Sequence, residues 1–168
     1  KLSLPSLQRA SKSCQGCPLY QHATQTVFGQ GPTTATLLFI GEQPGDQEDR
    51  AGKPFVGPSG HLLDVTLEKV GIDRSTVYVT NAVKHFKFTP RGKRRIHSKP
   101  TAREITACKP WLTAELQVVR PRLIVTLGAT AAQALLGRDF KVTQSRGVPI
   151  RDTPYAPCII ETVHPSSL

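Results

Sequence analysis

The stretch ATLLFIGEQPGDQEDRAGKPFVGPSGHLLD, residues 35–64, decides the fold of this chain. It begins with the short apolar run 35–40, whose β-favouring residues predict a buried strand. The run breaks at Gly41 into a loop rich in Gly and Pro, and after Ser59 the apolar spacing becomes helical. A strand, a long loop and a helix in this order form the unit that places a ligand beyond the carboxyl end of a strand.

The acidic loop, residues 41–59, restricts the kind of ligand that this unit can bind. Its glycines let the backbone approach a ligand closely. Its carboxylates would repel phosphate, and neither GxGxxG nor GxxxxGK[ST] occurs in the chain. The loop therefore suits a neutral planar ligand, or a reaction in which positive charge develops. A solvated surface loop is the alternative, but Phe55 and Val56 argue against it. The carboxylates are Glu42, Asp46, Glu48 and Asp49.

Length and charge give the broad class. The 168 residues predict one domain, 1–168, large enough for its own core. The net charge of +10 predicts a polyanionic partner. No stretch resembles a membrane span or a signal peptide, so we expect no membrane partner and a cytoplasmic, intracellular monomer.

Four cysteines predict a tetrathiolate metal site that ties distant segments together. One pair has CxxC spacing, and the other two lie far along the chain, unlike a compact zinc ribbon. A [4Fe-4S] cluster fits this pattern, with zinc as the alternative. Two disulfides or buried free thiols are also possible, although disulfides are disfavoured without a secretory signal. The candidate ligands are Cys14, Cys17, Cys108 and Cys158.

The remaining pattern predicts an α/β fold. Strands are expected at 76–83, 123–127 and 158–163, and helices after the Thr101–Glu104 capping box and over 129–136. Together with the first strand, they predict a three-layer sandwich with a four-stranded, mostly parallel central sheet. We expect residues 1–34 to be irregular, residues 138–157 to be rich in turns, and Pro110 to restart the helix that precedes it.

Two polar side chains follow predicted strands. Asn81 lies near the end of the second strand, where its amide could read the edge of a base or simply end the strand. His164 follows the last strand. Because the carboxyl ends of parallel strands meet at one edge of a sheet, both should gather with the acidic loop.

The basic stretch, residues 84–99, holds 7 of the 22 Lys and Arg residues. Pro90 and Gly92 break any helix, so we expect a loop. Two phenylalanines interleave with the cations, as in nucleic-acid contact surfaces, although a localisation signal or a solvated charge run has the same composition. The surrounding cations should lower the pKa of His97 and favour a neutral imidazole.

Two segments resemble motifs of a known family. GEQPGDQEDRAGKPFVGPSG, residues 41–60, resembles motif A of the iron-sulfur, family-four uracil-DNA glycosylases, and VHPSSL, residues 163–168, resembles their motif B. The four cysteines occur in the order expected of the cluster ligands. The resemblance implies the uracil-DNA glycosylase fold, a [4Fe-4S] cluster, uracil-containing DNA as the partner and free uracil as the product. It also implies a natural chain that continues beyond Leu168 and a nucleoid-associated protein when DNA is bound.

Two features depart from the ordinary family pattern. Gln43 stands where the ordinary enzymes usually carry a small residue, and RGKRRIHSKP, residues 91–100, is an extra basic segment. Both are similar to the UdgX-like class, in which the His of the Lys-Arg-Arg-Ile-His loop bonds covalently to DNA after uracil leaves. Residues 93–97 match that loop in residue type. The alternatives are a conventional multiple-turnover glycosylase that uses water, and a non-catalytic iron-sulfur module that binds nucleic acid.

The resemblance also implies how uracil is read. Phe55 would stack on the base, and Asn81 would bond its O4 and N3–H edge. His164 would donate towards O2, and Gly41 and Gln43 would complete the pocket.

The chemistry would then fall to carboxylates and one imidazole. Glu42 and Asp46 would stabilise the electron-poor sugar, and Glu42 would orient His97, which attacks C1′. The preferred substrate would be single-stranded DNA, from which the deoxyuridine is flipped. The expected DNA contacts are Lys93, Arg94, Arg95 and Ser166.

Overall fold

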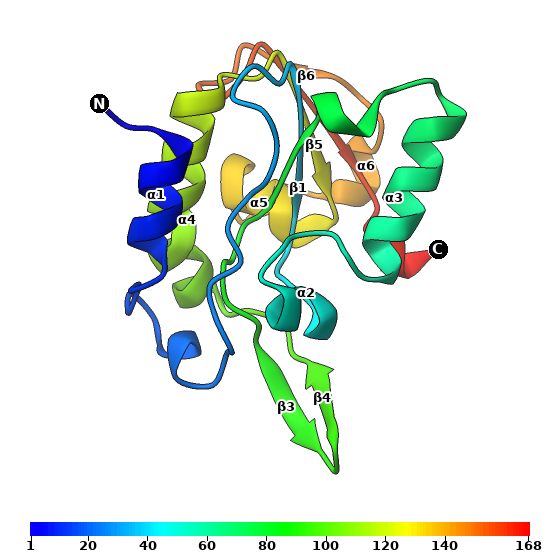
Figure 1. Cartoon of the computed structure of the whole chain (residues 1–168). Helices are drawn as coiled ribbons and strands as arrows, with labels where there is room; N and C mark the ends of the chain where they lie inside the picture. The colour runs from blue at the N-terminus through cyan, green and yellow to red at the C-terminus, as the bar shows by residue number, and fades with distance from the viewer.

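The computed structural model describes residues 1–168 and contains a central sheet with helices on both faces (Figure 1). The sheet has five strands in the order β2-β1-β5-β7-β6, not the four that we predicted. Strands β2, β1, β5 and β7 are parallel, and β6 pairs antiparallel with β7. The missed strand β6 is two residues long, too short for a periodic pattern. The strands are β1 Leu37–Gly41, β2 Tyr78–Asn81, β5 Leu123–Leu127, β6 Ile150–Arg151 and β7 Cys158–Thr162.

The alternation of side chains along β1 builds two cores. Leu38 and Ile40 face α4 and α5, whereas Phe39 faces α3. The helix α1 packs on α4, on the same side of the sheet (Figure 1). The predicted three layers are therefore present. The helices are α1 Leu4–Ser11, α2 Asp46–Ala51, α3 Pro58–Lys69, α4 Ala102–Val119, α5 Ala129–Leu136 and α6 Val142–Ser145.

The predicted bounds of β5 and α5 are confirmed, and two other predictions are wrong. Residues 1–34 are not irregular throughout, because Ser3 and Ser6 form a capping box that starts α1. Pro110 does not restart α4, which runs through it as one helix. Three short 3-10 turns complete the chain: η1 Pro18–Gln21, η2 Arg74–Thr76 and η3 Pro165–Ser167.

The basic stretch is a hairpin and not a loop. Strands β3 Phe88–Arg91 and β4 Arg94–His97 pair only with each other, so that Phe88 lies opposite His97. Gly92 makes the turn with a φ of +61°, in the left-handed region that favours glycine. A two-stranded ribbon tolerates Pro90, because an edge strand has backbone N–H positions that need no partner. This basic hairpin, residues 88–97, projects away from the sheet (Figure 1).

The acidic loop contains the short helix α2, which the glycine-rich sequence concealed. Gly52, with a φ of +71°, ends it. Glu48 closes the loop on itself, since its carboxylate accepts hydrogen bonds from the N–H groups of Gly45 and Gly57. No helix of the chain combines the length and the apolar character that crossing a membrane requires.

Candidate active site

A cavity of about 680 Å³ lies at the carboxyl edge of the parallel strands. It gathers the ends of β1, β2 and β5, the acidic loop, the basic hairpin and the segment after β7, as the strand pattern predicts. Lys99 and Thr130 line it as well. The predicted site residues that line it are Glu42, Gln43, Asp46, Phe55, Asn81, His97, His164 and Ser166.

Gly41 leaves the space that Phe55 and Asn81 occupy. A Cβ at position 41 would come within 2.5 Å of the Asn81 Oδ1 and 2.9 Å of the Phe55 Cζ. Phe55 adopts a φ of +56°, a strained backbone conformation for an aromatic residue. The backbone of Phe55 packs directly on Gly60 of α3, which holds this conformation. The result is a buried aromatic ring beside a buried side-chain amide, suited to a flat ligand with polar edges.

His97, Glu42 and Thr130 form a chain of hydrogen bonds across the cavity. The His97 Nε2 lies 2.7 Å from the Glu42 Oε1, and the Thr130 hydroxyl donates to the Glu42 Oε2 over 2.6 Å. Thr130 belongs to the first turn of α5, so helix α5 fixes the carboxylate that faces the imidazole. Burial raises the pKa of Glu42, but the hydrogen bonds from His97 and Thr130 outweigh it and lower the pKa overall.

The prediction that nearby cations lower the pKa of His97 is wrong. The hydrogen bond to Glu42 raises that pKa, against the smaller opposing effect of burial. The cations have little effect on the pKa of His97 because of where β4 places them. Arg94 is exposed to solvent, and Arg95 forms ion pairs with carboxylates.

Arg95 anchors the basic hairpin to α2. Its guanidinium donates to Asp46 and to the buried Asp49, each over 2.6 Å. The same guanidinium lies over the rings of Phe86 and Phe88, at 5.3 and 5.1 Å from their centroids. Asp49 also accepts from the Thr24 N–H. The anchor therefore joins three segments and fixes β4, the strand that carries His97.

Gln43 holds the hairpin from its other end. Its Oε1 accepts from the Lys87 N–H over 2.7 Å, and its Nε2 donates to the Ser98 carbonyl over 2.8 Å. These two residues flank the hairpin where its strands enter and leave. The Gln43 amide, which we expected to contact uracil, is thus engaged by the hairpin although the residue lines the cavity.

Asp46 is less available than Glu42 to stabilise a positively charged sugar. Hydrogen bonds from Arg50 and Arg95 lower its pKa, so two guanidinium groups already compensate its charge. Of the two carboxylates proposed to act on the sugar, Glu42 is the one that forms a hydrogen bond with His97.

The tautomer of His164 follows from its contacts. Its Nδ1 accepts from the Ser166 N–H over 3.1 Å and lies 2.7 Å from the Ser166 hydroxyl. A nitrogen that accepts from a backbone N–H carries no proton, so the neutral ring has its proton on Nε2. Burial lowers the pKa of His164, against the charge of Glu42, and favours this neutral form.

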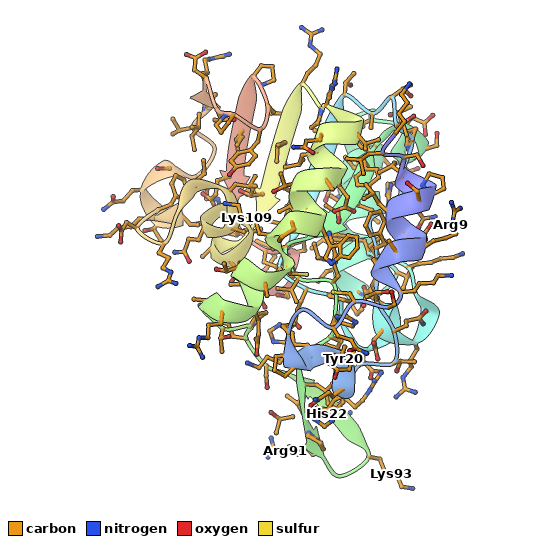
Figure 2. The ribbon with its side chains drawn as sticks, turned by 90° about the vertical axis from the view of Figure 1, so that its left-hand side faces the viewer. Arg9, Tyr20, His22, Arg91, Lys93 and Lys109 are labelled. Carbon is orange, nitrogen blue, oxygen red and sulfur yellow. The ribbon has the colours of Figure 1, made fainter.

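Two of the predicted DNA contacts lie at the exposed tip of the hairpin. Lys93 and Arg94 are exposed beside the turn, and Figure 2 shows Lys93 and Arg91 pointing away from the body of the molecule. The structure places Ser166 at the cavity, where it engages His164.

Three of the four cysteines lie in one region. Cys17 and Cys108 share an apolar cluster with Trp111, whose indole N–H donates to the Cys14 sulfur over 3.2 Å. The Lys84 N–H donates to the Cys108 sulfur over 3.2 Å. Burial, with smaller contributions from the neighbouring Cys17 and Cys14, raises the pKa of Cys108 to about 11 against the lowering effect of Lys84. These thiols fit a soft metal by type and by proximity.

Cys158 lies apart from this region. It begins β7 and pairs with Leu123 and Arg151, so it sits at the amino edge of the parallel strands. The Cys108 sulfur instead contacts the segment just beyond Asn81, at the carboxyl end of β2. All four cysteines are free of disulfide bonds. Because Cys158 lies at the opposite edge of the parallel strands from Cys108, the four-cysteine ligand set does not fit the structure.

Sequence reasoning missed several buried polar residues beside the site. Lys84 and Glu115 form a buried ion pair under β2, and Thr130 supports Glu42. His85, next to the amide that contacts Cys108, is buried, and burial lowers its pKa although Asp49 opposes the shift. The capping and strand patterns around these residues do not indicate their roles, since each role depends on a contact between distant segments.

Comparison with known proteins identifies the family. The Uracil DNA glycosylase superfamily matches residues 28–168. A type-4 uracil-DNA glycosylase of Thermotoga maritima is 40% identical over 94% of this chain and 78% of its own length. One of Sulfurisphaera tokodaii is 37% identical over 86% of this chain and 65% of its own, so less than two thirds of that relative is matched. A type-5 uracil-DNA glycosylase of Pyrobaculum aerophilum is 30% identical over 71% of this chain and 58% of its own length. The chain therefore belongs to the uracil DNA glycosylase superfamily, with type-4 uracil-DNA glycosylases among its relatives.

Proposed function

We propose that this protein excises uracil from DNA, preferentially from single strands, and that His97 then bonds to C1′ of the deoxyribose. The observation that carries the proposal is the His97–Glu42 hydrogen bond of 2.7 Å, inside the cavity that holds Phe55, Asn81 and His164. Uracil recognition and a candidate nucleophile thus share one cavity. The glycosylase part is further supported by the relatives, whose names state uracil-DNA glycosylase activity.

Uracil enters the cavity flipped out of its strand. Phe55 stacks on the ring, and the Asn81 amide accepts from N3–H and donates to O4. Cytosine presents the opposite pattern at this edge, so it would leave buried polar atoms of Asn81 unpaired.

Cleavage moves the electron pair of the C1′–N1 bond onto uracil. The Nε2–H of His164 donates to the uracil O2 and stabilises the departing anion. The sugar becomes an oxocarbenium ion, and the Glu42 carboxylate stabilises its positive charge.

His97 then captures the sugar. While its Nε2–H donates to Glu42, the neutral ring keeps its lone pair on Nδ1, which forms the new bond to C1′. The alkylated ring is an imidazolium, and Glu42 offsets its charge. An imidazolium bonded to C1′ is a poor target for water, so the adduct persists and each protein molecule releases one uracil.

The anchoring of the hairpin favours this route over turnover with water. Arg95 and Gln43 hold the two ends of the hairpin. Glu42 bonds to the imidazole of His97, so this carboxylate is not free to position a water molecule. The alternative, a conventional glycosylase, needs the same uracil contacts and differs only in what attacks C1′.

A denaturing gel separates these possibilities. Protein mixed with a uracil-containing single-stranded oligonucleotide should give a slower band that survives hot detergent, with free uracil in equal amount. The same sequence with thymine should give neither. Free uracil without the band would leave a conventional glycosylase, and binding without uracil release would leave a non-catalytic module. A double-stranded oligonucleotide should react more slowly.

The cofactor belongs to the same proposal. Cys14, Cys17 and Cys108 would hold a [4Fe-4S] cluster, or zinc as the alternative, with His85 rather than Cys158 as the fourth ligand. A buried imidazole that favours its neutral form is a suitable ligand. The bound group would tie the segment before η1, the end of β2 and helix α4 together, without a part in the bond-breaking step.

We predict that Cys158→Ser retains the metal and that His85→Ala loses it. Cys158 lies at the far edge of the sheet, whereas His85 follows the amide that contacts Cys108. Iron and zinc analysis together with visible absorbance of the purified variants measures this. A protein that loses its metal on Cys158→Ser would restore the four-cysteine set, and stoichiometric zinc would rule out the cluster.

Adduct formation should rise with pH. The hydrogen bond to Glu42 raises the pKa of His97, so below that pKa both ring nitrogens are protonated and no lone pair is available. The rate should therefore increase as pH rises through the raised pKa and level off above it. Single-turnover rates from about pH 5 to about pH 9, with uracil release followed in parallel, test this. A rate that falls over that range would contradict a neutral His97 nucleophile.

A further inference from the structure

Lys84 carries a fully buried charge beside Asn81, the residue proposed to bind the edge of uracil. Its side chain is 1% exposed, and that of its partner Glu115 is 0% exposed. The ammonium group donates to Thr80 Oγ1 over 2.6 Å, to the Asn81 carbonyl over 2.7 Å and to Glu115 over 2.6 Å. All three of its protons are thus satisfied, and one of them fixes the backbone of Asn81.

Glu115 makes this arrangement rigid. Its carboxylate also accepts from the Tyr78 hydroxyl over 2.8 Å, the Thr80 hydroxyl over 2.9 Å and the Gly29 N–H over 3.0 Å. The carboxylate therefore connects helix α4 with β2 and with the segment before β1. A buried pair with this number of hydrogen bonds has few alternative arrangements.

The main chain of Lys84 extends the connection to the cysteine region. Its N–H donates to the Cys108 sulfur, and its carbonyl accepts from the Val27 N–H over 2.8 Å. The two residues between Asn81 and Lys84 bond to the acidic loop: the Ala82 N–H donates to the Gly41 carbonyl and the Val83 N–H to the Glu42 carbonyl, each over 2.9 Å.

We propose that Lys84 is a positioning residue that fixes the uracil-reading Asn81 relative to the segment carrying the Cys108 thiol. This inference rests on the proposed function, in which Asn81 reads uracil. The ammonium group donates to the Asn81 carbonyl and so fixes the backbone that carries the side-chain amide. Because the backbone N–H of the same residue bonds to Cys108, a change in the cysteine region is transmitted to Asn81 through one residue.

Lys84→Met tests the inference, with Lys87→Met as the matched control. Both variants lose one ammonium group, but Lys87 pairs with Glu104 and makes no side-chain contact with Asn81. Lys84→Met should speed hydrogen exchange at the Ala82 and Val83 amides and lower the preference for uracil over cytosine about tenfold, the loss expected for one buried hydrogen bond. Lys87→Met should change neither.

A second variant covers the case in which Lys84→Met does not fold. Lys84→Met/Glu115→Gln removes both charges and keeps an acceptor for Tyr78 and Gly29, and replacing both members of a buried pair is tolerated better than replacing one. A folded variant with unchanged exchange and unchanged base preference overturns the inference. If the wild-type protein releases no uracil, the proposed function fails, whereas the exchange rates still decide whether Lys84 fixes the end of β2.

Discussion

His97→Ser should abolish the detergent-resistant adduct while uracil release continues. Serine has no lone pair activated by Glu42 at the position of the imidazole, because its side chain is shorter than that of histidine. The uracil contacts that we propose for Phe55, Asn81 and His164 would remain, and the space left by the imidazole would admit water to C1′. We therefore expect loss of the crosslink to below detection, together with several uracils released per protein molecule.

The measurement is the denaturing gel combined with quantification of free uracil under excess oligonucleotide. His61→Ser is the matched control, since His61 lies exposed on α3 and does not line the cavity. The control should retain the crosslink and release one uracil per protein. A crosslink that survives His97→Ser would show that another residue attacks the sugar.

Glu42→Gln should slow adduct formation by about 10²- to 10³-fold, the usual contribution of one preorganised electrostatic group. The amide oxygen can still accept from the His97 N–H, and the amide NH2 group can donate to the Thr130 hydroxyl oxygen, so the substitution removes the charge and keeps the shape of the side chain. Uracil release should slow as well, because the carboxylate stabilises the positive sugar before His97 attacks.

Single-turnover rates of uracil release and of crosslinking separate the two roles of Glu42. Glu68→Gln, an exposed change on α3 with the same loss of charge, should leave both rates unchanged. The pKa of His97 should also fall towards its ordinary value, which shifts the pH dependence of crosslinking downward. Rates equal to the wild type would remove Glu42 from the chemistry.

Much of the fold could be predicted because its strands and helices have strong periods. Strand β5 and helix α5 were predicted to the residue, and the carboxyl-edge position of Asn81 and His164 follows from parallel strand order. Strand β6 was missed because two residues carry no period. Pro90 and Gly92 predict a loop because they argue against a helix and against a central strand, whereas a self-paired ribbon accepts both.

Most of the site residues could be predicted, together with the Glu42–His97 contact that the family resemblance implies. The sequence did not indicate that Thr130 supports Glu42, that Gln43 bonds to both ends of the hairpin, or that Arg95 pairs with Asp46. Such contacts join positions more than forty residues apart, and no local spacing encodes them. Cys158 shows the same limit, since the order of cysteines along a chain does not reveal at which edge of a sheet each one lies.

The basic hairpin pairs with no strand of the central sheet. The residue that would make the new bond therefore stands on an appendage, whereas the groups that would break the old bond stand on the scaffold. An enzyme that turns over and a protein that crosslinks once could then differ by a short insertion on an unchanged scaffold. Such a difference makes one behaviour readily accessible from the other during evolution.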